Sequence, residues 1–113
     1  MTKELWINLP VKDINRSKEF FSKLGFSFNN KYAGEDSVGL MIGSKNIIVM
    51  LFKVAAFEKF TGNKISDTKL GAEVLLSFDA ESKEEVDEMA SKAEAGGANI
   101  FSKPTEIQGW MYG

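Results

Sequence analysis

The sequence predicts an α+β fold in which two βαβββ modules form an open, cup-shaped sheet with the helices outside. Apolar and polar residues alternate in the way typical of half-buried strands. The order strand, capped helix, glycine, strand also occurs twice along the 113 residues, and each module alone would leave one sheet face uncovered. By length the chain is a single domain, 1–113, with a first module over 4–53, a linker with a short helix over 54–71 and a second module over 72–113.

The first module begins with a half-buried strand in the stretch LWINLPVKD. Its aliphatic residues alternate and are expected to face the helix: Leu5, Ile7, Leu9 and Val11. Trp6 and Asn8 are then expected to point into the cup. Asp13 is the predicted N-cap of the helix that follows, and Gly25 supplies the left-handed residue that ends it.

Three more strands complete the predicted first module. One begins at Phe26, and two others, Ser37 to Ile42 and Asn46 to Lys53, form a hairpin joined by a glycine-containing loop. The run IIVMLF is apolar on both faces, so we expect that strand to be central and covered on both sides. Val54 to Phe60 is predicted to be a short helix.

The second module repeats this order with different residues. Glu73 to Phe78 is the predicted strand, and Ser82 with Glu85 is a capping box that starts a helix. Gly96-Gly97 ends that helix. Asn99 to Ser102 and Gly109 to Tyr112 are the remaining strand candidates.

Composition excludes several kinds of chemistry. The chain has no cysteine and no histidine, which removes disulfides, thiol nucleophiles and the commonest general base near neutral pH. The net charge of −2 and the scattered basic residues predict no nucleic-acid partner. The sequence has no apolar run of membrane-spanning length and no secretory signal, so we expect a soluble cytoplasmic protein with no membrane partner.

The stretch LPVKDINRSKEFFSKLGFSF resembles the opening of the vicinal oxygen chelate superfamily, which includes glyoxalase I, bleomycin-resistance proteins and extradiol dioxygenases. The matching residues, in order, are Val11, Asp13, Ser17, Phe20-Phe21, Leu24, Gly25 and Phe26. The resemblance continues through EVLLSFDAESKEEVDEMASKAEAGGA to the GWMYG at the end. It is specific for the fold and unspecific for the reaction.

The resemblance also implies where metal ligands would lie in metal-using members. The first would fall on Trp6, a second on about Met50 and a third on Glu73. The fourth would lie on an eighth strand, which we expect beyond Gly113, so the second module is predicted to be incomplete at its C-terminus. One carboxylate is too few for a divalent metal, which usually takes about three protein ligands in a catalytic site. We therefore expect no metal and no other cofactor.

Side-chain parity predicts a cup lined by aromatic, methionine and a few polar residues, which is typical of small-molecule sites. The predicted lining is Trp6, Asn8, Met50, Phe52, Glu73, Leu75, Trp110 and Tyr112. Deep in such a cup the Glu73 carboxylate could act as a general base, whereas at its mouth it would be an ordinary solvated group. The alternative is a cup filled by its own side chains, with Trp6 on Met50.

The leading hypothesis is a glyoxalase-family-like protein that binds a small aromatic or planar molecule without a catalytic metal. One alternative is a divalent-metal-dependent lyase, isomerase or dioxygenase of the same superfamily, so whether the protein is an enzyme stays open. A second alternative is a catalytically degenerate dimeric scaffold. Members of the superfamily are commonly dimers, and the apolar Trp110-Met111-Tyr112 end is available for a homodimer contact.

Overall fold

The computed structural model describes residues 1–45 and 47–113, which form two compact units, Met1–Leu70 and Gly71–Gly113. Asn46, the first residue of one predicted strand, lies outside the described residues. The first unit contains, in chain order, β1 (Trp6–Val11), α1 (Ile14–Lys23), β2 (Ser27–Asn29), the 3₁₀ helix η1 (Asn30–Tyr32), β3 (Ser37–Ile42), β4 (Ile47–Lys53) and α2 (Val54–Thr61).

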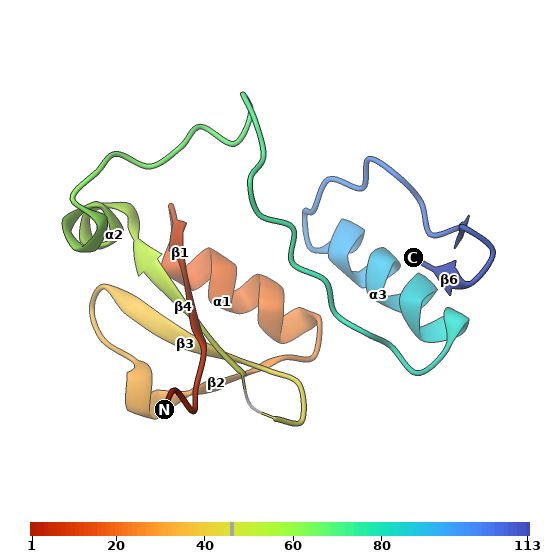
Figure 1. The fold of residues 1–113 in the computed structure, drawn as a ribbon, viewed down its shortest axis with the longest axis horizontal. Coiled ribbons are helices and arrows are strands. Elements are labelled where there is room, and N and C mark those ends of the chain that lie inside the picture. Colours follow the sequence, from red (N-terminus) through yellow and green to blue (C-terminus); the bar gives the residue numbers. More distant parts are fainter. Residues whose placement is uncertain (46) are drawn as a thin grey trace. The chain divides into compact units, whose positions relative to one another are not determined.

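The described strands of the first unit form a mixed sheet in the order β1-β4-β3-β2 (Figure 1). β1 runs parallel to β4, while β3 is antiparallel to both β4 and β2. This is the βαβββ order predicted for the first module. β4 lies between two strands, as its apolar sequence on both faces predicted.

Helix α1 begins and ends at the predicted residues. The Asp13 carboxylate accepts a hydrogen bond from the backbone N–H of Arg16 at 3.1 Å, which satisfies one of the free donors at the helix start. Gly25 follows the last helical turn with φ of +97°, a backbone conformation that favours glycine. Both residues confirm the expected caps.

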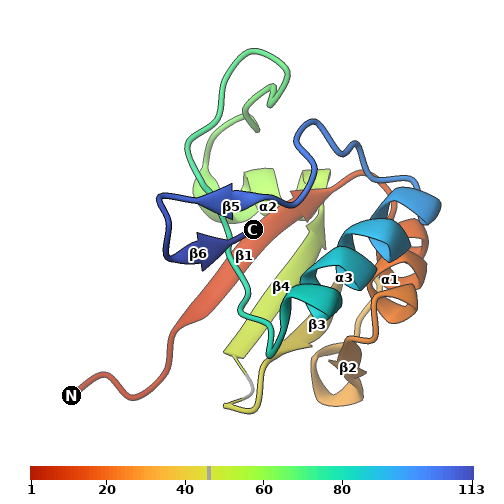
Figure 2. The same ribbon diagram turned by 90° about the vertical axis from the view of Figure 1, so that its right-hand side faces the viewer.

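The core of the first unit lies between α1 and one face of the sheet (Figure 2). Its buried centre consists of Val38, Leu40, Val49 and Leu51. The aliphatic side chains of β1 pack against this centre, as do Ile14 and Phe21 of α1. Alternation in β1 therefore assigned the helix-facing side correctly for Ile7, Leu9 and Val11.

The second unit contains α3 (Lys83–Ala95), β5 (Glu106–Ile107) and β6 (Met111–Tyr112). The Ser82 hydroxyl accepts a hydrogen bond from the Glu85 N–H at 3.1 Å, which confirms the predicted N-cap. The Glu85 carboxylate accepts one from the Glu81 N–H at 3.2 Å. Of the helices in the described ranges α3 is the longest, and none is long and apolar enough to cross a membrane.

Two strands predicted for the second module do not form in the part of the chain that the structure describes. Glu73 to Phe78 and Asn99 to Ser102 form neither helix nor strand, so this unit has a helix and a short hairpin where βαβββ was expected. Alternation selects the face a side chain prefers, but a strand also needs a neighbouring strand to bond its backbone. The prediction over Gly109 to Tyr112 was half right, because Gly109, with φ of +74°, belongs to the turn between β5 and β6.

Candidate functional site

The face of the first unit's sheet opposite the core carries the candidate site. The parallel register aligns Trp6 with Ile48, Asn8 with Met50 and Pro10 with Phe52. Side chains two residues apart on a strand share a face. The predicted lining residues Trp6, Asn8, Met50 and Phe52 therefore share one face, and the core residues occupy the other.

Trp6 forms one end of this face together with Tyr32. The two rings meet edge to face, with centroids 4.8 Å apart and planes at 83°. The indole N–H of Trp6 donates to the Glu4 carboxylate at 3.1 Å, and the Trp6 side chain stays 38% exposed. The Lys31 ammonium lies 5.7 Å from the centre of the Tyr32 ring, so both signs of charge border this aromatic pair.

Phe52 forms the other end. Its ring lies 5.3 Å from that of Phe60, which comes from α2, the helix directly after β4. Trp6 and Phe52 are four residues apart in register, so roughly 13 Å of sheet separates the two aromatic pairs. Phe60 is largely exposed and could contact a bound molecule.

Asn8 and Met50 lie midway between the aromatic pairs. They are register partners, and Met50 is aligned in turn with Gly39 of β3. Met50 is 7% exposed, while Asn8 is exposed and its side chain makes no hydrogen bond to another residue of the described chain. The centre of this face thus combines a covered apolar side chain with one available amide beside it.

The other predicted site residues belong to the second unit. Glu73 and Leu75 lie in the extended segment before α3, and Leu75 is 90% exposed. Trp110, in the β5–β6 turn, is 74% exposed and donates its indole N–H to the Gln108 side chain at 3.3 Å. Their role in ligand binding, and the role of Glu73 as a general base, stay predictions.

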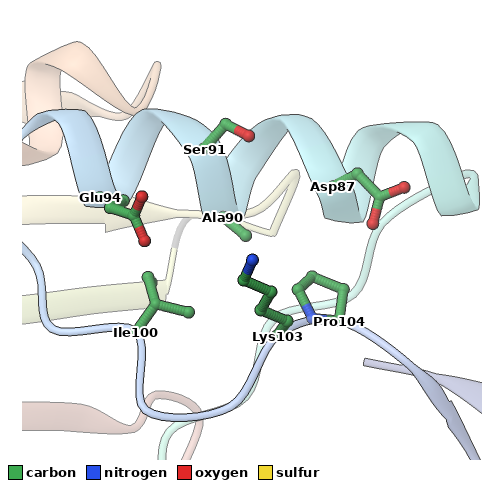
Figure 3. A pocket seen from close by; sticks show the side chains of 7 residues that line it. All are labelled: Asp87, Ala90, Ser91, Glu94, Ile100, Lys103 and Pro104. Atoms are coloured by element: carbon green, nitrogen blue, oxygen red, sulfur yellow. The ribbon is translucent and has the colours of Figure 1, made fainter.

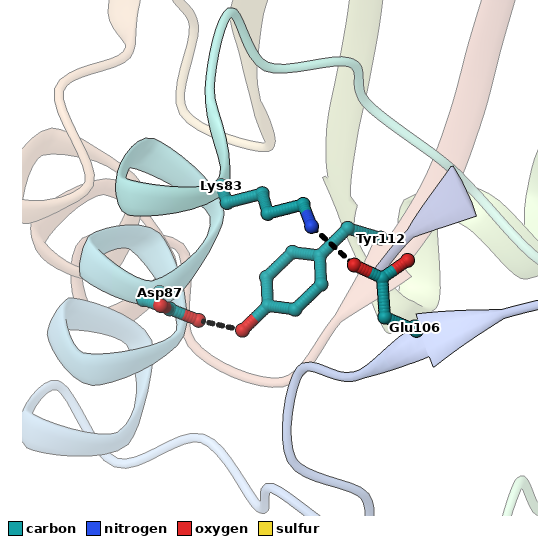
Figure 4. A network of polar contacts seen from close by, with 4 residues as sticks. All are labelled: Lys83, Asp87, Glu106 and Tyr112. Atoms are coloured by element: carbon teal, nitrogen blue, oxygen red, sulfur yellow. Dashed lines mark hydrogen bonds and ion pairs between the residues drawn. The ribbon is translucent and has the colours of Figure 1, made fainter. Parts of the chain in front are cut away.

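Tyr112 belongs to a polar network that joins β5 and β6 to α3 (Figure 4). Its hydroxyl donates to the Asp87 carboxylate at 2.6 Å, and Lys83 forms an ion pair with Glu106 while lying 5.4 Å from the Tyr112 ring centre. The hydrogen bond to Asp87 raises the pKa of the Tyr112 phenol, and the bond to Glu106 raises the pKa of Lys83. Within its own unit, then, the Tyr112 hydroxyl is already occupied.

A groove of about 340 Å³ also lies in the second unit, between α3 and the segment that follows it (Figure 3). It is lined by Asp87, Ala90, Ser91, Glu94, Ile100, Lys103 and Pro104. No predicted site residue lines it. Its two carboxylates and one ammonium make a polar surface, unlike the aromatic face of the first unit.

The chain resembles known proteins both in sequence and in fold. The family model for the N-terminal part of bleomycin resistance protein-like chains matches residues 3–43. A solved structure of the hypothetical protein SA1046 from S. aureus is 29% identical, with a TM-score of 0.85 over 99% of this chain and 82% of that one. A glyoxalase/bleomycin resistance protein/dioxygenase family enzyme from Burkholderia phytofirmans is 24% identical, with a TM-score of 0.76 over 91% and 80%. Residues 3–43 thus resemble the bleomycin resistance protein-like family in sequence, and the chain has the fold of glyoxalase/bleomycin resistance/dioxygenase structures.

These similarities establish the fold more firmly than the chemistry. A glyoxalase-related enzyme from Fulvimarina pelagi has a TM-score of 0.79 at 12% identity, over 96% of this chain and 74% of that one. Among curated proteins no match is found. Since one fold can carry many unrelated functions, the site has to be interpreted from its own residues.

Those residues do not fit the divalent metal of the metal-using superfamily members. The Trp6 indole has no free lone pair, and a buried Met50 thioether suits soft Cu(I) better than Zn, Fe or Mn. No three carboxylates come together as a metal-binding group in the described residues. The expectation of a metal-free site follows from this donor set and stays a prediction.

Two members of the aromatic face were missed by the sequence analysis, namely Tyr32 and Phe60. Tyr32 lies in η1, a turn that begins where the Asn29 side chain accepts a hydrogen bond from the Lys31 N–H at 3.0 Å. The Asn29-Asn30 pair signals that turn but not where the next aromatic points. Phe60 is a helical residue whose contact with Phe52 depends on how α2 folds back.

Proposed function

We propose that this protein is a member of the glyoxalase/bleomycin-resistance/dioxygenase superfamily that binds a small planar or aromatic molecule on the aromatic face of its first unit, without a catalytic metal. The observation that carries the proposal is the placement of Trp6 and Phe52 at opposite ends of one sheet face. Each is paired with a second aromatic ring, Tyr32 or Phe60. Small-molecule sites are typically apolar and aromatic with a few placed polar groups, and Asn8 supplies such a group here.

The dimensions of the face favour a molecule of one or two rings. About 7 Å, the rise of two strand residues, separates Asn8 from Trp6 on one side and from Pro10, the register partner of Phe52, on the other. A ring resting on either aromatic pair would thus place a polar substituent within reach of the Asn8 amide. Each aromatic contact would contribute on the order of 1 kcal/mol beyond the burial of area.

The experiment is a fluorescence titration with a panel of planar ligands, using a variant that isolates one reporter. The chain has two tryptophans, so Trp110→Phe leaves Trp6 as the single emitter. We expect a ligand to quench or shift Trp6 emission in that variant, and Trp6→Leu to weaken binding roughly tenfold by calorimetry. Trp110→Phe is also the matched control and should keep the wild-type affinity. If no ligand of the panel changes Trp6 emission, the proposal is wrong.

Metal analysis of the purified protein tests the metal-free part separately. We expect no stoichiometric Zn, Ni, Fe or Mn, and no loss of ligand binding after treatment with a chelator. A stoichiometric divalent metal would contradict the proposal and support the metal-dependent enzyme.

The open two-module cup, with Glu73, Leu75, Trp110 and Tyr112 as further lining, is a separate prediction, and the proposal needs only the face of the first unit.

One observation favours the scaffold as the second candidate. Met50 is buried at the centre of the face, and Trp6 contacts Tyr32 at one end of it, as a face filled by its own side chains would require. The same titration distinguishes the two functions, because a scaffold would leave Trp6 emission unchanged with every ligand.

We further propose that the protein is a homodimer. Large apolar side chains of the second unit are exposed, which is typical of surfaces that bind another protein. They are Val74, Leu75, Leu76, Phe78, Phe101, Trp110 and Met111. Sedimentation at several protein concentrations tests this proposal: we expect a dimer in the wild type and a weaker one in Leu75→Asp. A monomer at all concentrations would contradict it.

A further inference from the structure

Tyr32 lies directly on the backbone of the sheet. A Cβ atom placed on Gly39 would be 2.8 Å from the Cβ of Tyr32, closer than real Cβ atoms come, and 3.1 Å from its Cδ2, which is also a tight contact. Gly39 is buried although it has no side chain of its own. Tyr32 therefore occupies the space that a side chain at position 39 would fill.

The ring of Tyr32 reaches across the central strand. It contacts Gly39 on β3 and the Trp6 ring on β1, and these two strands lie on opposite sides of β4. Their separation is about 10 Å, so the two rings meet above β4. Ile48 and Met50, which point to this face from β4, are both buried.

Charge gives this part of the site little selectivity. Glu4 borders the Trp6 ring and Lys31 borders the Tyr32 ring, so an anionic and a cationic group lie at the same end of the face. No hydrogen bond joins the Tyr32 hydroxyl to any other described residue. What Tyr32 supplies is chiefly volume.

We propose that Tyr32 is the size-determining residue of the ligand site: its ring fills the space above β4 and makes the wild-type protein favour single-ring ligands over ligands with two fused rings. This inference rests on the proposed function, since it concerns which planar molecules that face accepts. Removing the ring would open the floor formed by Ile48, Met50 and Gly39. Ligands with two fused rings would then gain contact area, whereas single-ring ligands would lose a ring to pack against.

The test compares two probes, 4-nitrophenol with one ring and 1-naphthol with two, by calorimetry on the full chain. In Tyr32→Ala the affinity for 1-naphthol relative to 4-nitrophenol is expected to rise roughly fivefold over wild type. Tyr32→Phe keeps the ring and should keep the wild-type ratio. Circular dichroism checks that each variant is folded. Tyr32→Leu, which keeps an apolar side chain of smaller area, should also raise the affinity for 1-naphthol relative to 4-nitrophenol.

The outcomes separate the two proposals. An unchanged ratio in folded Tyr32→Ala and Tyr32→Leu, with wild type binding at least one probe, overturns the size-determining role but leaves the proposed function standing. If wild type binds neither probe and Tyr32→Ala binds 1-naphthol, the wild-type preference for single-ring ligands is overturned. If no variant binds either probe, both proposals fail.

Discussion

Gly39→Ala is expected to destabilise the first unit, although the substitution adds one methyl group to a residue whose backbone needs no left-handed conformation. The cost has a defined source. The added Cβ would approach the Cβ of Tyr32 to 2.8 Å, and two ring atoms of Tyr32 would lie at 3.1 and 3.3 Å from it. Alanine is otherwise tolerated in a buried strand, so the clash decides whether the substitution lowers or raises the free energy of unfolding.

The magnitude follows from the overlap. Carbon atoms pack best at about 3.5–4.0 Å, so the approach is too close by about 0.7 Å or more. Overpacking of this kind typically costs about 1–3 kcal/mol. Replacing glycine by alanine also restricts the unfolded chain, which offsets about 0.4–1 kcal/mol of this cost. The expected net loss in the free energy of unfolding is therefore about 1–2 kcal/mol.

The assay is urea unfolding followed by Trp6 fluorescence in a Trp110→Phe background, so that the signal comes from the first unit. Gly34→Ala is the matched control, because the nearest atom to a Cβ there is the Ser37 hydroxyl oxygen at 3.8 Å. It should be neutral or slightly stabilising. Unchanged m-values would show that the compared variants expose similar surface on unfolding.

A second background identifies the clashing atom. In Tyr32→Gly the Cβ and ring of residue 32 are gone, and Gly39→Ala should then cost nothing. In Tyr32→Ala the Cβ remains at 2.8 Å, so most of the cost should persist. An equal cost of Gly39→Ala with and without the residue 32 side chain would refute the reasoning.

Three further predictions concern stability and titration. Leu51→Ala should lower the free energy of unfolding by about 2–5 kcal/mol in denaturant melts, because Leu51 is 1% exposed in the core. Asp13→Ala should cost about 1 kcal/mol through loss of the α1 cap, and Asp13→Asn should restore most of it. Because the Asp87 hydrogen bond raises the pKa of the Tyr112 phenol, its stabilising effect should be complete below the usual tyrosine pKa and be lost as pH rises through the folded pKa. Tyrosinate absorbance should therefore show a tyrosine that ionises later in wild type than in Asp87→Ala, and identical titrations would contradict this.

The first unit was predictable because its signals are local. The N-cap at Asp13, the glycine at 25 and the alternation of β1 each act within a few residues, and the structure contains all three. The position of β4 inside the sheet was also predictable, since its sequence is apolar on both faces. From this parity alone the shared face of Trp6, Asn8, Met50 and Phe52 follows.

What could not be predicted depends on contacts between distant residues. Tyr32 reaches the candidate site only because a 3₁₀ turn aims it at a glycine on the next strand. The alternation over 73–78 is as regular as that of β1, yet no strand among the described residues pairs with it. The apolar–polar alternation within one segment does not specify which strand, if any, pairs with that segment.

The pairing of β1 with β4 also has a consequence for the order of folding. β3 and β4 are joined by a short loop, whereas β1 pairs Trp6 with Ile48 across most of the first unit's length. Closing the longer loop costs more chain entropy, and this cost comes before the contacts between β1 and β4 can offset it. The β3–β4 hairpin can therefore form early, while the N-terminal strand docks late. Because that strand carries Trp6, the aromatic face is completed only in the last step, and Trp6 emission during refolding should lag behind the formation of the hairpin.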